Sequence, residues 1–195
     1  MRSRPRLLAA LLPLLALPLA RAAAVERIER VLAVVDDMPA LLSETVALQR
    51  LKPYGREEAL QALIDELLML REASRLREAA PTREEEQRAY DSLIAKLDGA
   101  AAVADPEALR RIAWRQSVIL KYIELRFRPQ IRIDEAELQQ AYAEQYAGRT
   151  DAPPLADVSK QLLEQLQVRA LDKRIEGWVA ELRAAARVRI NPEPR

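Results

Sequence analysis

Apolar residues recur with the period of an α-helix along most of this chain, in runs that end at proline or glycine. The segment 56–77 shows the pattern most simply. Its apolar residues occupy the i, i+3, i+4 and i+7 positions of one helix face: Leu60, Leu63, Ile64 and Leu67. Only four glycines occur in 195 residues, and aromatic residues make up 4%. The sequence therefore predicts a mainly α-helical fold, and it disfavours a β-sandwich or a doubly wound sheet.

Helix-start signals predict further long helices. Thr82 and Glu85 have the spacing of a capping box, Asp105 followed by Pro106 supplies an N-cap and a proline at the first helical position, and Asp134 caps a helix after a proline break. The expected helices span 56–77, 82–97, 105–128, 134–148 and 157–186.

The segment 30–43 is the clearest β-like stretch, because two short apolar runs flank a pair of aspartates that favour a turn. We expect a hairpin there, and then a short helix with Ser43 as its N-cap. Residues 188–190 (Val-Arg-Ile) alternate like a short strand. We expect this strand to pair with 31–35, so that the C-terminal segment completes the small sheet.

The helix expected at 105–128 is apolar on two nearly opposite faces. One stripe contains Leu109, Ile112, Ile119, Leu120, Ile123 and Phe127, and the other contains Trp114, Val118, Tyr122 and Leu125. Such a helix is either covered by neighbours on both sides or keeps one face for a partner. The sequence leaves both interpretations open.

The helix expected at 157–186 changes its apolar face along its length. Its early apolar residues (Val158, Leu162 and Leu166) lie on a different face from its later ones (Leu171, Ile175, Trp178, Val179 and Leu182). This helix must bend or contact two different partners.

The residue types exclude most catalytic sites. The chain has no cysteine and no histidine, so thiolate, imidazole and disulfide chemistry are absent. The acidic clusters at 57–58 and 84–86 occupy first helical turns, where negative side chains favour the helix dipole, and 36–37 occupies a turn. There is no glycine-rich phosphate loop, so we expect no nucleotide, metal or other cofactor.

The N-terminus has the pattern of a secretory signal peptide. Arginines precede an apolar run over 7–19, which two prolines interrupt and which is too short to span a membrane, and the small residues Ala20 and Ala22 form the expected cleavage signal. We expect residues 1–22 to be removed and the mature protein to lie outside the cytoplasm without spanning a membrane.

Removal takes away four arginines and no acid, so the formal net charge falls from +1 to −3. A mildly acidic chain with mixed charges gives no electrostatic reason to expect nucleic-acid binding.

The order of these segments resembles the N-terminal chaperone domain of SurA-type periplasmic folding factors. The segments that carry the resemblance are VLAVVDDMPALLSETV, REEALQALIDELLMLREASRL, PTREEEQRAYDSL, DPEALRRIAWRQSVILKYIELRFRPQIRIDEAELQQAYAEQY and LDKRIEGWVAELRAAARVRI. The resemblance implies a helical chaperone domain over 23–147 and a C-terminal helix and strand over 158–195 that pack back on it.

The family's parvulin prolyl-isomerase domain normally lies between these two parts. Here the interval is the linker 148–157, far below the roughly 50 residues that a domain requires. The resemblance therefore implies a periplasmic, ATP-independent chaperone without isomerase activity, which binds unfolded exported polypeptides such as outer-membrane protein precursors.

The candidate client-binding residues are Trp114, Val118, Tyr122, Leu125, Tyr142 and Tyr146. Two alternatives stay open. One is a dedicated assembly or structural partner of a single exported protein, and the lesser one is a peptidyl-prolyl isomerase with an unrecognised site.

Overall fold

A computed structural model describes residues 29–97 and 105–191 of the chain. The signal-peptide prediction for 1–22, with Ala20 and Ala22, lies outside the described residues. The described part is mainly helical and contains a small antiparallel sheet, as the sequence predicted.

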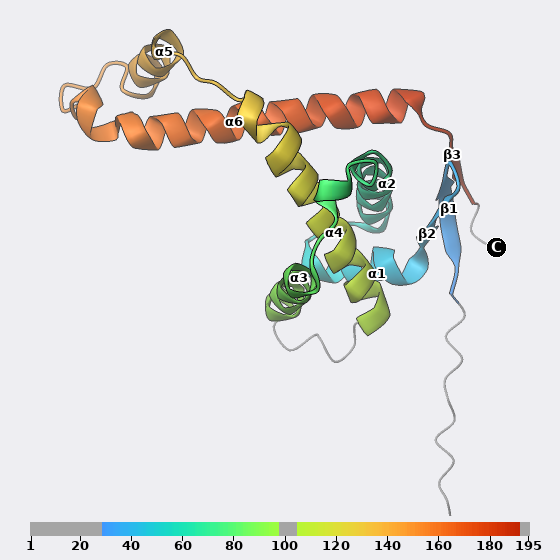
Figure 1. Cartoon of the computed structure of the whole chain (residues 1–195). Helices are drawn as coiled ribbons and strands as arrows, with labels where there is room; N and C mark the ends of the chain where they lie inside the picture. Colours follow the sequence, from blue (N-terminus) through green and yellow to red (C-terminus); the bar gives the residue numbers. More distant parts are fainter. Residues whose placement is uncertain (1–28, 98–104, 192–195) are drawn as a thin grey trace, which may run out of the picture.

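Figure 1 shows the elements in their order along the chain. The strands are β1 (Val31–Val35), β2 (Met38–Leu41) and β3 (Val188–Ile190). The helices are α1 (Leu42–Leu51), α2 (Arg56–Ala73), α3 (Arg83–Lys96), α4 (Pro106–Arg126), α5 (Glu135–Gln145) and α6 (Leu155–Ala185), with short 3₁₀ turns η1 (Arg77–Ala79) and η3 (Arg128–Gln130).

The three strands lie in the order β2-β1-β3, so the C-terminal strand pairs with the first strand. Both pairings are antiparallel. The hairpin turns at Asp36, whose φ of 55° lies in the left-handed region that aspartate tolerates better than most residues. The Asp36 carboxylate also accepts a hydrogen bond from the backbone N–H of Arg187 at 3.1 Å and contacts Arg71 on α2. The turn therefore links the sheet, α2 and the segment between α6 and β3.

Side-chain caps start α3, α4 and α5 as the sequence predicted. Thr82 and Glu85 form a reciprocal capping box, as do Asp134 and Glu137, and Asp105 accepts a hydrogen bond from the N–H of Glu107 at 3.0 Å. The start of α1 differs from the prediction. Its N-cap is Leu41, with no side-chain cap.

Ser43 lies inside α1, where its hydroxyl donates to Glu29 Oε2 at 2.5 Å. The chain enters α1 directly from β2, so no capping turn separates the two elements. Ser43 instead uses its hydroxyl to tie the start of α1 to the residues before β1.

The core divides into two adjoining clusters. The first joins the sheet to α1, α2, α3 and the N-terminal half of α4, with Leu63, Ile112 and Val35 almost fully buried. The second joins the end of α2, the C-terminal half of α4 and α6. At its centre Tyr122 stacks on Trp178 with ring centroids 5.1 Å apart, and Phe127 meets Trp178 edge-on.

Helix α6 contacts two partners, which explains its change of apolar face. Its N-terminal half packs against α5, and its C-terminal half packs against α2 and places Trp178 and Leu171 in the second cluster. An ion pair of 2.5 Å between Arg183 and Asp65 adds to the α2 contact. Figure 1 shows α6 lying across the helical body, with α5 near one end and the sheet near the other.

Candidate functional site

The candidate client-binding residues of α4 separate into exposed and buried pairs. Trp114 and Leu125 are 40% and 49% exposed. Val118 and Tyr122, which belong to the same predicted stripe, are buried at 3% and 9% exposure. In this structure Val118 and Tyr122 are not accessible to a client, because the second core cluster forms around them and Trp178 covers the Tyr122 ring.

Most of the second apolar stripe therefore supports packing. The interpretation of α4 as a helix covered on both sides holds for Val118 and Tyr122. Trp114 and Leu125 remain exposed on a similar side of α4, about 16 Å apart along the axis. Leu120, assigned to the first stripe, is 61% exposed on a different side.

Tyr142 and Tyr146 lie where α5 turns back toward α6. The Tyr142 hydroxyl donates to the carbonyl of Pro153 at 2.7 Å, and the two rings pack with centroids 5.0 Å apart. Arg149 lies over the Tyr146 ring. Both side chains are half-buried, so the structure gives this pair a clear role in holding the connection 148–157.

A shallow recess lies between α6 and the chain after η3. Its volume is about 350 Å³, and its lining is Ile131, Ala170, Lys173, Arg174 and Gly177. No atom lies within 4 Å of where a Cβ of Gly177 would be, so the recess is open at this point. Its lining combines the apolar Ile131 and Ala170 with the cationic Lys173 and Arg174, and Arg174 also lies over the Phe127 ring.

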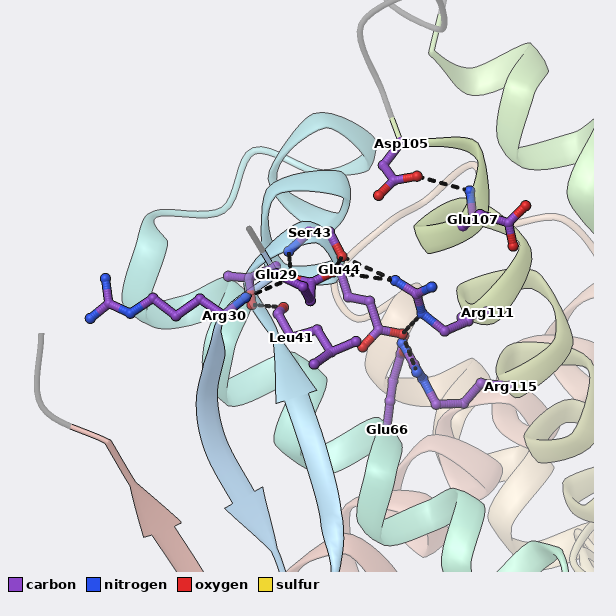
Figure 2. Close-up of polar contacts among 11 residues, drawn as sticks. Glu29, Arg30, Leu41, Ser43, Glu44, Glu66, Asp105, Glu107, Arg111 and Arg115 are labelled. Carbon is purple, nitrogen blue, oxygen red and sulfur yellow. Dashed lines mark hydrogen bonds and ion pairs between the residues drawn. The ribbon is translucent and has the colours of Figure 1, made fainter. Parts of the chain in front are cut away.

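A cluster of charged side chains lies inside the helical body. Figure 2 shows Arg115 of α4 directed between Glu44 of α1 and Glu66 of α2. Arg115 Nη1 donates to Glu44 Oε1 at 3.0 Å, and Arg115 Nε donates to Glu66 Oε2 at 2.8 Å. The side chains of Arg115 and Glu44 are 4% and 3% exposed, so the pair is withdrawn from water.

More exposed residues extend this network toward the surface. Arg111 reaches Glu44 Oε1 at 3.4 Å and donates to the Ser43 hydroxyl at 3.0 Å, and Ser43 in turn donates to Glu29 (Figure 2). Gln116 donates to the second Glu66 oxygen at 2.8 Å. The network ties three helices to Glu29, which lies shortly before β1.

The electrostatics of the network keep Arg115 charged, which suits a structural role and not proton transfer. Burial alone lowers the pKa of Arg115, but the charges and hydrogen bonds of Glu66 and Glu44 outweigh it and raise the pKa above the usual guanidinium value. A guanidinium held in its charged form cannot act as a general base. Arg115 Nη2 is buried without a hydrogen-bond partner in the described part of the chain.

The sequence position of Arg115 indicates that this charge is buried. Arg115 follows Ile112 by three residues and precedes Val118 by three, so it lies on the buried arc of α4. A charged residue in such a position must find charged or polar partners inside the fold.

Within residues 29–97 and 105–191, no group of three His, Cys, Asp or Glu side chains is placed to hold a metal ion. Among the helices of these ranges, none combines the length and the hydropathy needed to cross a membrane.

Comparison with known proteins gives no neighbour for this chain: no family model, no curated protein and no solved structure matches it.

Proposed function

We propose that the protein is an ATP-independent periplasmic chaperone that binds unfolded exported polypeptides, including outer-membrane protein precursors, without prolyl-isomerase activity. The observation that carries the proposal is that large apolar side chains stay exposed on two helices: Trp114 and Leu125 on a similar side of α4, and Val168 on α6. The order of the elements, with the C-terminal strand paired to the first strand, agrees with the resemblance.

Separated apolar contacts suit a reversible holdase. Full burial of one large apolar side chain is worth roughly 1.5–3 kcal/mol, so a few partly buried contacts hold an extended chain weakly and release it without an energy source. On the same helix as Val168, Lys160, Gln161 and Glu164 are exposed, and such charged and polar side chains favour the solubility of a loaded complex.

The recess beside Gly177 adds a place for one client side chain. Its apolar lining residues Ile131 and Ala170 match an aliphatic or aromatic group, and the charges of Lys173 and Arg174 favour a segment with acidic neighbours.

A second candidate function is a dedicated partner of one exported protein. The modest number of exposed large apolar side chains in the described residues favours it, because promiscuous binding surfaces generally present broader apolar patches. Capture from periplasmic extract distinguishes the two: a single stoichiometric partner supports this candidate, and many clients support the chaperone.

Light scattering of a urea-diluted outer-membrane β-barrel precursor tests the chaperone. We expect the protein to suppress aggregation at near-stoichiometric ratios. The double variant Trp114→Gln, Leu125→Gln should need about tenfold more protein, which corresponds to about 1.4 kcal/mol of binding. Leu120→Gln is the matched control, since it removes a more exposed leucine from another side of the same helix.

Equal suppression by the double variant and the wild type would exclude the Trp114 and Leu125 surface, and no suppression by the wild type would exclude the chaperone. A protease-coupled assay of proline isomerisation should show no acceleration. A clear acceleration would restore the isomerase alternative.

A further inference from the structure

The outer edge of β3 combines an unpaired strand edge with exposed apolar side chains in the described part of the molecule. β3 is the last strand of the sheet, and no strand of the described residues lies beyond it. Val188 and Ile190 are 40% and 51% exposed, although they lie directly opposite Val35 and Ala33, which are completely buried. Residues directly opposite each other lie on the same face of a sheet. Val188 and Ile190 therefore lie on the face that packs against the core, but no helix covers them fully.

The hydrogen bonds of the sheet show which backbone groups of β3 face outward. The carbonyl of Arg187 accepts from Asp36 N–H, and Asn191 N–H donates to the carbonyl of Leu32, both at 2.8 Å. Residues 187, 189 and 191 therefore direct their backbone groups toward β1. Because these directions alternate along a strand, the N–H and C=O groups of Val188 and Ile190 point away from the sheet.

The opposite edge of the sheet is closed to strand addition. In β2, Pro39 lies opposite Val34, and Val34 directs its backbone groups toward β3. Pro39 therefore occupies an outward-facing position of β2 and offers no N–H there. Natural sheets protect edges in this way, and the edge of β3 has no proline among its strand residues.

We propose that β3 accepts an extended segment of another polypeptide as a fourth, antiparallel strand, with apolar side chains at every second position and acidic side chains between them. The apolar side chains would lie opposite Val188 and Ile190, next to a hollow of about 230 Å³ whose lining includes Leu32, Leu60 and Ile190. The acidic side chains would lie opposite Arg189, on the other face of the sheet. This interaction surface does not depend on the chaperone proposal.

Charge argues against a second copy of the chain in two antiparallel registers, those centred on residues 189 and 188. In an antiparallel β3–β3 pair centred on residue 189, Arg189 lies opposite its own copy. In a pair centred on residue 188, it lies opposite Arg187 of the other copy. Like charges directly opposite each other destabilise a strand pair, whereas glutamate opposite arginine stabilises it.

Binding of three labelled peptides to the full chain, measured by fluorescence anisotropy, tests the proposal. The first alternates valine with glutamate over eight residues. The others carry N-methyl groups on the valines or on the glutamates. The proposed register directs the valine N–H groups toward β3 and the glutamate N–H groups away from it. Methylated valines should abolish binding, and methylated glutamates should preserve it.

Variants of β3 make the test specific to this edge. Ile190→Pro removes one outward N–H and should weaken binding about tenfold, while Ile190→Thr keeps that N–H and should bind more tightly than Ile190→Pro. Arg189→Glu should reverse the preference from the glutamate peptide to one that alternates valine with lysine. Circular dichroism and melting confirm that each variant is folded.

Three results would overturn the proposal. The first is equal affinity of the chain for the two methylated peptides. The second is peptide binding by the Ile190→Pro variant that equals binding by the wild type. The third is a concentration-dependent dimer of the chain that the Ile190→Pro substitution dissociates. The last result would assign the edge to a second copy.

Discussion

At the scale of single residues, Arg115 has the most demanding environment in the described chain. It is buried between helices and satisfied mainly by the carboxylates of Glu44 and Glu66. Burying these charges costs solvation energy, which their attraction offsets only while all members are present. The network therefore fixes how α1, α2 and α4 pack together more than it adds net stability.

Replacing Arg115 with methionine should lower the free energy of unfolding by about 3–5 kcal/mol, because it removes the cation of Glu66 and leaves the buried Glu44 carboxylate only the more distant Arg111. Adding Glu44→Gln to this variant should recover part of the loss, because a buried and poorly compensated charge is then removed. Urea denaturation measures both changes. The control is Arg126→Ala at an exposed position of the same helix, expected to cost less than about 1 kcal/mol. Similar losses for Arg115→Met and Arg126→Ala would contradict the importance of the network.

The Glu85 carboxylate at the start of α3 should titrate below its usual range. A hydrogen bond from Lys121 at 2.9 Å and another from the backbone N–H of Thr82 lower its pKa. Its stabilising effect is therefore present above the unfolded-state pKa and is lost as the pH falls through the folded-state value. Carbon-13 NMR titration should show the low pKa of Glu85, and Lys121→Met should move this pKa upward.

At the scale of elements, α6 shows how one helix joins separate parts of the fold. Its C-terminal half packs Trp178 against both Tyr122 and Phe127, and its N-terminal half packs against α5. Because the two halves contact different partners, their apolar residues lie on different faces of the helix.

Trp178→Ala should destabilise the protein by about 3–5 kcal/mol, because it removes a buried ring and leaves a cavity beside Tyr122 and Phe127. Trp114→Ala is the matched control. Its ring is 40% exposed, so we expect a loss of less than about 1 kcal/mol. Thermal melting followed by circular dichroism gives both values. A larger loss for Trp114 than for Trp178 would mean that α6 does not cover α4 as described.

The helices and the individual strands could be predicted because their signals are local. Capping residues mark helix starts, and alternation marks strands, so Thr82, Asp105 and Asp134 predicted the starts of α3, α4 and α5. The candidate site depended on which neighbour covers each face of α4, and that is a property of tertiary packing. A helical wheel places Val118 and Leu125 together, but Trp178, more than 50 residues later, lies in the cluster that buries only the first of them.

At the scale of the whole molecule, the chain closes on itself, because its last strand pairs with its first. β3 bonds to β1, Arg183 pairs with Asp65 on α2, and α6 supplies Leu171 and Trp178 to the second core cluster. Residues after 157 therefore complete both the sheet and the core of the part that precedes them. The boundary between 23–147 and 158–195 is not a boundary between independently stable units in this arrangement.

Deleting the residues after Asp157 should abolish cooperative unfolding of the remainder. The deletion exposes Tyr122, Phe127 and Val118 to water and leaves β1 and β2 as a two-stranded sheet. Calorimetry of the truncated and full chains measures the effect. Adding the missing segment back as a separate peptide should restore part of the transition, because the lost contacts are noncovalent. A truncated protein that keeps its melting transition would mean that the N-terminal part folds without α6 and β3.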